Sequence, residues 1–338
     1  MTRLCTWPGH QHPDQVAGAE LARSSPADVA REYAAAATAP NTERAYQLQW
    51  RLFVEWCNER NFFYLPAEPS TVANFIGYQA AAGMSPASID VALAAISKRH
   101  ELGKLPSPRD SVEVRIVRAG IRRKHGTAQV GRAALTVEVL RDLVRSMPTT
   151  IASPACHYGI RDRALLLVGF AGALRRSELV SLNWGDVEFL DRGMMLTIRK
   201  SKTDQEGKGR LVGIAHGKVL MTCPVNAMQA LSVLFRRFGD EKPKGAVFRS
   251  FASSGPSHRL FDGDVGRILK RHLVAVGYDA RGYGAHSLRV GFVTAAIAAG
   301  KSRTAIKRQT GHRSDEMVDR YARPVELFDD NPSDGIGL

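Results

Sequence analysis

The sequence predicts a mainly α-helical protein of two domains, with a small antiparallel β-sheet in the second domain. Three observations lead to this prediction. A chain of 338 residues is long enough for about two domains. Apolar residues recur at helical spacing over most of it. A stretch of small and polar residues, GTAQVGRAA (126–134), has the composition of a linker and separates two regions with different patterns.

The first region, residues 26–125, has a helical pattern without a clear strand. One apolar face at helical spacing is made by Tyr46, Trp50, Phe53 and Cys57. Asn41 or Thr42 is a suitable N-cap for that helix. Further helices are expected over Ser70–Ala81, from Ser85-Pro86 through Ile96, and over Val112–Lys124. We therefore expect a helical bundle, preceded by a flexible tail over residues 1–25.

The second region, residues 135–324, combines helices with short strands. Asp186–Arg199 predicts two strands joined by the turn LDRG, and Gly209–Ala215 predicts a third. Helices are expected over 136–146, 161–174, 224–238, 262–276, 286–299, 302–310 and 314–322. Residues 325–338 form a short acidic tail that contains Leu327 and Phe328.

The charge of the chain points to a polyanion as partner. Lys and Arg number 47 against 33 acids, which gives a net charge of +14. Ten of these cations, against three acids, fall within Lys98–Arg132, and we expect nucleic-acid contact there rather than only a solvated helix face. Four cysteines without a CxxC pair, no apolar leader and no membrane-length apolar run favour a cytoplasmic, nucleoid-associated protein over a secreted or membrane protein.

Four polar clusters interrupt the apolar helices of the second region. They are GALRRSEL (172–179), RKSKTD (199–204), GAHSLRV (284–290) and TGHRSDEMVDRYAR (310–323). Each has an ordinary structural explanation: the arginines of the first suit a helix C-terminus, and the second is a basic hairpin tip. Together they supply six groups that suit attack on a phosphodiester without a metal ion: Arg175, Lys202, His286, Arg289, His312 and Tyr321. Guanidinium groups match phosphate oxygens, and a phenol of pKa about 10 needs a positive pocket or a base to act as nucleophile.

In this order and spacing, the motifs resemble those of the tyrosine recombinase (phage integrase) family, and most closely those of its Cre-type members. The similarity covers nearly all of the chain, since WRLFVEWCNERNFFYLPAEPSTV and KLPSPRDSVEVRIVRAGIRRKHG resemble the core-binding, SAM-like domain of such enzymes. The resemblance implies a site-specific recombinase that cleaves and rejoins duplex DNA through a 3′-phosphotyrosine intermediate, without metal, ATP or another cofactor. A type IB topoisomerase and a non-catalytic DNA-binding regulator are the alternatives.

The resemblance also implies roles for the cationic residues. Arg175 and Arg289 would clamp the scissile phosphate, Glu178 would support Arg175, and Lys202 would protonate the departing 5′ oxygen. Arg176 is an alternative to Arg175, and Lys200 and Lys208 are alternatives to Lys202. Arg175 is preferred over Arg176 because it has the Leu before it and the Glu three residues after it.

The remaining roles fall to two histidines and a tyrosine. By resemblance, His286 hydrogen-bonds the phosphate or handles the tyrosine proton, and His312, where Cre has tryptophan, donates to a non-bridging oxygen. Tyr321 would attack the phosphorus. Tyr278 and Tyr283 lie closer in sequence to His286, but neither follows a Gly-His turn.

The implied partner is double-stranded DNA that carries inverted-repeat recombination sites. Five residues are expected to contact it: Arg44, Arg122, Arg123, Lys124 and Arg259. The resemblance further implies a homotetramer on DNA, a monomer in free solution, and a tail (325–338) that docks on a neighbouring protomer. Asp186, Glu188 and Asp191 could suggest a metal site, but we expect solvent-facing positions on a strand and its turn instead.

Overall fold

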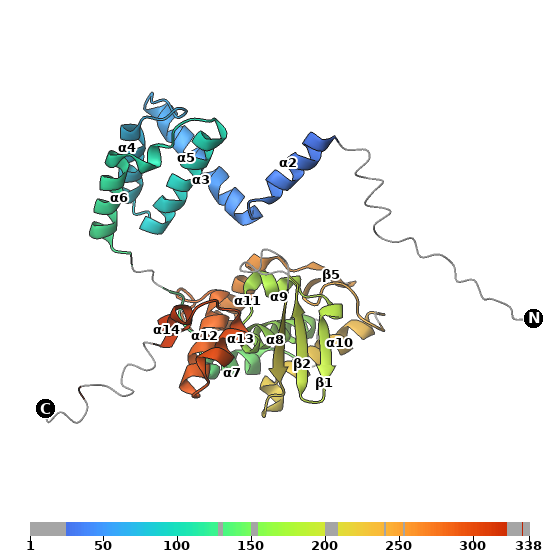
Figure 1. Cartoon of the computed structure of the whole chain (residues 1–338). Helices are drawn as coiled ribbons and strands as arrows, with labels where there is room; N and C mark the ends of the chain where they lie inside the picture. The colour runs from blue at the N-terminus through green and yellow to red at the C-terminus, as the bar shows by residue number, and fades with distance from the viewer. Residues whose placement is uncertain are drawn as a thin grey trace, which may run out of the picture. The chain divides into compact units, whose positions relative to one another are not determined.

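The computed structural model describes residues 25–127, 131–149, 155–199, 209–239, 241–252, 254–322 and 333. The chain divides into two compact units, Met1–Gln129 and Val130–Leu338, which are described separately. Figure 1 shows a helical first unit and a second unit that combines helices with short strands.

The described part of the first unit is helical throughout. Its helices are α2 (Pro26–Ala36), α3 (Pro40–Glu59), α4 (Pro69–Ala81), α5 (Pro86–Leu102) and α6 (Val112–His125), with a 3₁₀ turn at Pro108–Asp110. Four of the five helices begin with proline, whose fixed φ suits a first helical position. The side chains of Ser25, Ser85 and Ser111 cap helices by accepting a backbone N–H three residues later.

The start of α3 differs from the sequence prediction. Asn41 and Thr42 were expected as N-caps, but the helix begins at Pro40 and its N-cap, Ala39, makes no side-chain cap bond. Proline is pre-organised for the first turn, so the helix starts before either polar residue. The expected apolar face is present: Phe53 and Cys57 are fully buried in the core of the unit, whereas Tyr46 is only half-buried.

The second unit opens with three helices and a sheet. These are α7 (Val137–Ser146), α8 (Ala155–Ala171), α9 (Arg176–Ser181), and strands β1 (Val187–Leu190), β2 (Gly193–Ile198) and β3 (Arg210–Ala215). The strands form an antiparallel sheet of order β1-β2-β3, in which Val187 pairs with Leu196 and Met194 with Ile214. A second hairpin, β4 (Arg249–Ala252) with β5 (Gly255–Arg259), was not predicted from the sequence.

The rest of the unit is helical: α10 (Pro224–Arg237), α11 (Asp262–Ala275), α12 (His286–Ala298), α13 (Arg303–Thr310) and α14 (Asp315–Ala322). Short 3₁₀ turns lie at Trp184–Asp186 and Leu220–Thr222. The fold-class prediction, mainly α with a small antiparallel sheet, is confirmed. None of the described helices is both long and apolar enough to span a membrane.

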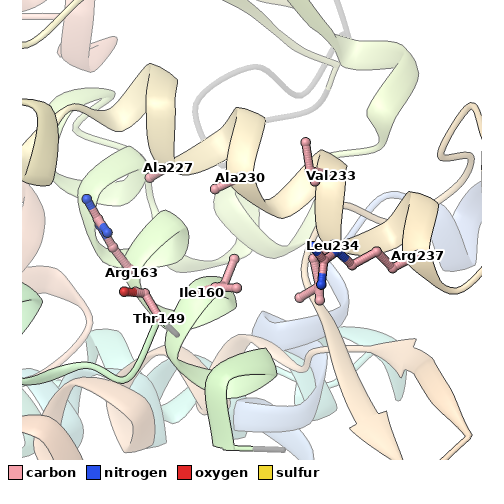
Figure 2. A pocket seen from close by; sticks show the side chains of 8 residues that line it. All are labelled: Thr149, Ile160, Arg163, Ala227, Ala230, Val233, Leu234 and Arg237. Atoms are coloured by element: carbon pink, nitrogen blue, oxygen red, sulfur yellow. The ribbon is translucent and has the colours of Figure 1, made fainter. Parts of the chain in front are cut away.

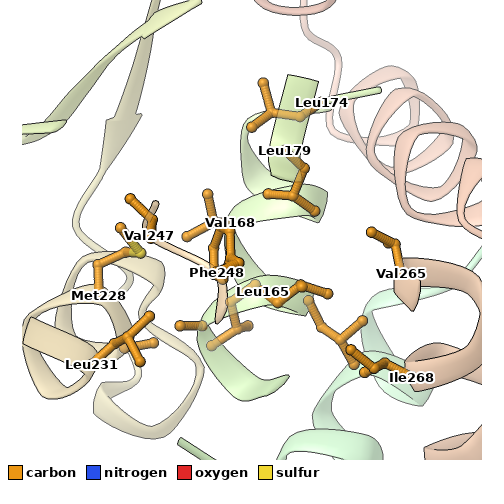
Figure 3. Packing of buried hydrophobic residues seen from close by; sticks show 14 of the residues in the cluster. Leu165, Val168, Leu174, Leu179, Met228, Leu231, Val247, Phe248, Val265 and Ile268 are labelled. Carbon is orange, nitrogen blue, oxygen red and sulfur yellow. The ribbon is translucent and has the colours of Figure 1, made fainter. Parts of the chain in front are cut away.

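Helix α8 forms the centre of the second core. Leu165 and Val168 are fully buried, and the helix packs against α10, α11 and α12. Figure 3 shows these two side chains between Met228 and Leu231 of α10 and Ile268 of α11. A smaller apolar cluster of Val293, Ile306 and Val318 joins α12, α13 and α14, and Tyr321 packs against it. Both clusters fix the elements that carry the polar side chains described below.

One of the three acidic residues near β1 differs from its expected position. Asp186 was expected on the solvent side of a strand, but it ends a 3₁₀ turn and is 4% exposed. Its carboxylate accepts the N–H of Asn183 at 2.9 Å and pairs with Arg199 Nε at 2.5 Å. Glu188 and Asp191 are exposed as expected. Among the described residues, no group of three or more His, Cys, Asp or Glu could hold a metal ion.

Helix α12 lies directly against the backbone at the start of the second unit, and this contact can be tested. A Cβ added to Gly291 would lie 1.9 Å from the carbonyl oxygen of Leu135. We expect Gly291→Ala to lower the free energy of unfolding by about 1–3 kcal/mol, as overpacking does. Urea denaturation measures this change. Gly263→Ala on α11, where a Cβ meets nothing within 4 Å, is the control and should be neutral or stabilising. Equal midpoints for Gly291→Ala and wild type would contradict the packing.

Candidate active site

Seven polar side chains from separate elements of the second unit form one cluster, called the polar cluster below. Its members are Arg175, Glu178, Arg210, His286, Arg289, His312 and Tyr321. They are linked by hydrogen bonds, by a ring contact and by mutual effects on their pKa values. Five of the six residues proposed from the sequence are therefore brought together, along with Glu178.

The turn between α8 and α9 places the first arginine. Helix α8 ends at Ala171, Ala173 takes a left-handed φ of 48°, and Arg175 is the N-cap of α9. The sequence allowed a purely structural role for these arginines at the C-terminus of the preceding helix. The structure places them instead at the start of the next helix. Arg176 is 57% exposed and pairs with Asp262 at 3.1 Å, outside the polar cluster. Of these two arginines, only Arg175 belongs to the polar cluster.

Glu178 joins two arginines. Its carboxylate is 1% exposed and accepts the backbone N–H of Arg175 at 3.0 Å and Nη1 of the same residue at 2.7 Å. Nη2 of Arg210 donates at 3.0 Å to Oε2, the oxygen that also accepts the backbone N–H of Arg175. Burial alone would raise the pKa of Glu178, but the hydrogen bonds from Arg175 and the charge of Arg210 outweigh it and lower the pKa. The carboxylate is therefore ionised at neutral pH.

Arg210 is the member of the cluster that sequence reasoning missed. It is the first residue of β3, and its Nη1 donates to the carbonyl of Gln309 at 2.7 Å, three residues before His312. Its Nε is buried without a partner among the described residues. Strand alternation could have identified it, because Arg210 shares its face of β3 with the buried Val212 and Ile214.

Arg289 lies deepest in the cluster. It is 2% exposed, and its Nη1 donates to the carbonyl of Ala173 at 2.7 Å. Its Nη2 is buried without a partner in the described part of the chain. Burial, and then the charge of Arg175, lower the pKa of Arg289 to about 10, which leaves it charged at pH 7. A buried cation with a spare N–H beside a second cation is costly unless an anion binds there.

His286 and Tyr321 meet at the open side of the cluster. Nε2 of His286 lies 3.2 Å from the Tyr321 hydroxyl. The ring has substantial solvent exposure, but partial burial, followed by the charges of Arg289 and Arg175, lowers the pKa of His286. The imidazole is therefore neutral at pH 7, and a neutral Nε2 at this distance can accept the phenolic proton.

His312 is buried beside the same tyrosine. Its ring is 8% exposed and stacks on Tyr321, with centroids 6.2 Å apart and an angle of 21° between the planes. Burial and the surrounding arginines lower its pKa to about 3. Nδ1 lies 3.0 Å from Oγ1 of Thr310. The second histidine is thus also neutral in the free protein.

The hairpin lysine lies outside the described residues, and so do its two rivals. Lys202, Lys200 and Lys208 fall within 200–208, between β2 and β3. The strand that follows this segment begins with Arg210, which belongs to the polar cluster.

The expected DNA contacts divide into two groups. Arg44, Arg122, Arg123 and Lys124 are exposed on the first unit, the last three at the end of α6. Arg259 is instead half-buried and engaged: Nη1 donates to the carbonyls of Val180 at 2.6 Å and Leu182 at 3.2 Å. Its Nη2 donates to Oδ1 of Asn183 at 2.6 Å. This guanidinium holds the end of α9.

A pocket of about 210 Å³ lies between α8 and α10, lined mainly by apolar side chains (Figure 2). Its polar lining comes from Thr149, Arg163 and Arg237. No member of the polar cluster lines it, so the chemistry suggested by the cluster is not located there.

A family profile, two curated relatives and one solved structure are similar to this chain. The profile of the phage integrase family matches residues 134–326. An integrase/recombinase xerD homolog of Selenomonas ruminantium is 32% identical over 300 residues, 87% of this chain and 84% of that protein. The recombinase cre of Escherichia phage P1 is 31% identical over 156 residues, 45% of each. A lambda integrase tetramer bound to a Holliday junction aligns with a TM-score of 0.57 at 16% identity, over 86% of this chain and 74% of that one.

The buried His312 predicts a loss of stability in acid. As pH falls through 6.5, the unfolded chain takes up a proton at this residue, whereas the folded protein does so only near pH 3. At pH 5.5 this linkage destabilises the free protein by about 1.4 kcal/mol. The free energy of unfolding, measured in urea at pH 7.5 and 5.5, should fall less for His312→Asn than for wild type, because the variant lacks this histidine. His216→Asn, at an exposed position, should keep the wild-type pH dependence. Identical pH dependence in wild type and His312→Asn would refute the assignment.

Proposed function

Because the chain belongs to the phage integrase family and is a tyrosine-type site-specific recombinase that cleaves and rejoins DNA, we propose that Tyr321 is its nucleophile and forms a 3′-phosphotyrosine. The observation that carries this proposal is the phenol of Tyr321, 3.2 Å from a neutral His286 and close enough to the buried Arg289 to affect its pKa. The family predicted from the motifs is confirmed. The match to the xerD homolog is nearly twice as long as the match to cre, so we propose an enzyme of the Xer kind rather than of the Cre kind.

The scissile phosphate would bind between Arg175 and Arg289. The unpartnered Nη2 of Arg289 supports this position, because an anionic oxygen would complete its hydrogen bonding. Planar guanidinium groups bind non-bridging phosphate oxygens bidentately and counter the charge that develops in the transition state. Glu178 and Arg210 would hold Arg175 in place without touching DNA.

Proton transfer would accompany the in-line attack. Nε2 of His286 accepts the phenolic proton as the bond from Tyr321 to phosphorus forms. The bond to the 5′ oxygen breaks, and Lys202 supplies the proton that this oxygen needs to leave as a hydroxyl. Religation reverses both transfers, so the bond energy is conserved and neither ATP nor a metal ion is needed.

The first unit would supply DNA contacts. Arg44, Arg122, Arg123 and Lys124 are exposed, and the net charge of +14 favours the DNA backbone. Affinity should therefore fall steeply with salt. A base contact by Arg259 would require its guanidinium to leave the carbonyl groups of Val180 and Leu182.

The nucleophile can be tested with a nicked DNA that carries inverted repeats flanking the element that encodes this protein, in the presence of EDTA. We expect an SDS-resistant protein–DNA adduct whose peptide maps to Tyr321. Tyr321→Phe should form no adduct but keep salt-sensitive DNA binding, because only the hydroxyl is lost. Tyr278→Phe, at a tyrosine that hydrogen-bonds Asp142 in the same unit, is the control and should form the adduct. An adduct in Tyr321→Phe, or none in wild type despite tight binding, would overturn the proposal.

Assembly on DNA is a further part of the proposal. We propose that the protein is monomeric in solution and forms a tetramer on two DNA sites, with the tail 325–338 docked on a neighbouring protomer. The tail lies outside the described residues, apart from Ser333, and its acidic and apolar composition supports this role. A lambda integrase, which has a similar fold, is known as a tetramer on a Holliday junction.

Deleting residues 325–338 should leave binding to a single DNA site intact and weaken pairing of two sites, measured by gel shift and by recombination. The reason is that the tail would contact protein rather than DNA. A shorter deletion from residue 331 retains Leu327 and Phe328 and should behave more like wild type. Full recombination by the longer deletion would rule out the docking role.

A further inference from the structure

The hydroxyl of Thr310 lies against the ring of His312. Thr310 is the last residue of α13 and is fully buried. Gly311 follows with a left-handed φ of 68°, which a residue with a side chain rarely adopts, and turns the chain back. The turn brings the imidazole of His312 to the hydroxyl two residues earlier, with Nδ1 3.0 Å from Oγ1.

The hydrogens around this hydroxyl can be counted. Oγ1 lies 2.8 Å from the carbonyl oxygen of Ile306, 3.0 Å from Nδ1 of His312 and 3.3 Å from the backbone nitrogen of His312. The hydroxyl has one hydrogen. Two oxygens at 2.8 Å need a hydrogen between them, so this hydrogen points to Ile306, which cannot donate. The backbone N–H and Nδ1 must then both donate to Oγ1, and the hydrogen of the neutral ring is on Nδ1.

This tautomer leaves Nε2 without a hydrogen. Nε2 can therefore accept a proton but cannot donate to a phosphate oxygen. The charged and titratable groups that act on the ring come from four elements: Arg175 at the start of α9, Arg210 on β3, Arg289 and His286 on α12, and Tyr321 on α14, which stacks on it. The cations among them oppose a further positive charge in the free protein, whereas a bound phosphate would offset them.

We propose that Thr310 is a positioning residue that holds His312 as the Nδ1–H tautomer, so that His312 becomes a phosphate donor only by taking up a proton from solvent when the DNA phosphate binds. The inference rests on the proposed function, since it assumes a phosphate between Arg175 and Arg289. The proton balance is simple: one solvent proton adds to Nε2, the ring becomes an imidazolium, and its Nδ1–H still donates to Thr310.

The tautomer can be read directly by NMR of the full chain with ¹⁵N-labelled histidine, using His312→Asn to assign the ring. In the free wild type we expect a protonated Nδ1 and a bare Nε2, and on addition of the nicked DNA both nitrogens should be protonated. In Thr310→Val, which keeps the shape but lacks the hydroxyl, the Nδ1–H preference should be lost. Thr310→Ser should keep it. A hydrogen on Nε2 in the free wild type would overturn the inference.

Proton uptake gives an independent readout. Calorimetry of DNA binding at pH 7.5 in buffers of different ionisation enthalpy should show more proton uptake by wild type than by His312→Asn. Equal uptake by the two proteins would also overturn the inference.

Adduct formation tests the consequence for chemistry. We expect Thr310→Val to form the Tyr321 adduct about 10- to 100-fold more slowly, as for other partners that orient a histidine, with unchanged DNA binding. Thr310→Ser should restore most of the rate. Thr197→Val on β2, outside the cluster, is the control and should cleave at the wild-type rate. Wild-type cleavage by Thr310→Val would contradict the role.

The failure of this inference can be distinguished from failure of the proposed function. If wild type forms the Tyr321 adduct but Nδ1 of His312 carries no hydrogen, the inference is rejected and the proposed function stands. No adduct in wild type rejects the function, and since the inference assumes the same bound phosphate, it falls with it.

Discussion

The buried carboxylate of Glu178 binds two arginines from distant parts of the second unit, and the polar cluster depends on this contact. Arg175 lies in the turn before α9 and Arg210 at the start of β3, and the same carboxylate accepts hydrogen bonds from both. Arg210 also donates to the carbonyl of Gln309, just before His312. One carboxylate therefore couples the helix that carries the first arginine, the sheet, and the turn that carries the second histidine. Removing it would leave two guanidinium groups without their anion.

The cluster is electrostatically incomplete without an anion. Arg289 is buried with a spare N–H, and the pKa values of His286 and His312 are lowered by burial and by the neighbouring cations. Such an arrangement costs stability in the free protein and favours a phosphate, which completes the hydrogen bonds and offsets the charge. Burial first, and then the charges of the same arginines, keep the two histidines neutral. The arginines proposed to bind the phosphate thus also favour an unprotonated histidine beside Tyr321.

Apolar packing positions the two reactive ends. Helix α8 is fixed in the large core, and its C-terminal turn presents the carbonyl of Ala173 to Arg289. The small cluster of Val293, Ile306 and Val318 ties α14 to α12 and α13, which brings Tyr321 to His286. Tyr321, the proposed nucleophile, therefore packs on a satellite cluster, separate from the main core that contains α8.

The sequence by itself determined most of the helices, the three strands of the larger sheet and the family, and it named six of the seven cluster residues, all except Arg210. Local chemistry explains this success: proline and serine begin the helices at fixed positions, and the motifs carry their residue types in a specific order. The partnership of Arg210 with Glu178, the burial of Asp186, the engagement of Arg259 and the contact of Thr310 with His312 were decided only by the tertiary structure. Arg210, Asp186 and Arg259 have partners far along the chain, which no helical or strand period brings together. Thr310 and His312 are close in sequence, but the direction of the Thr310 hydroxyl depends on the carbonyl of Ile306.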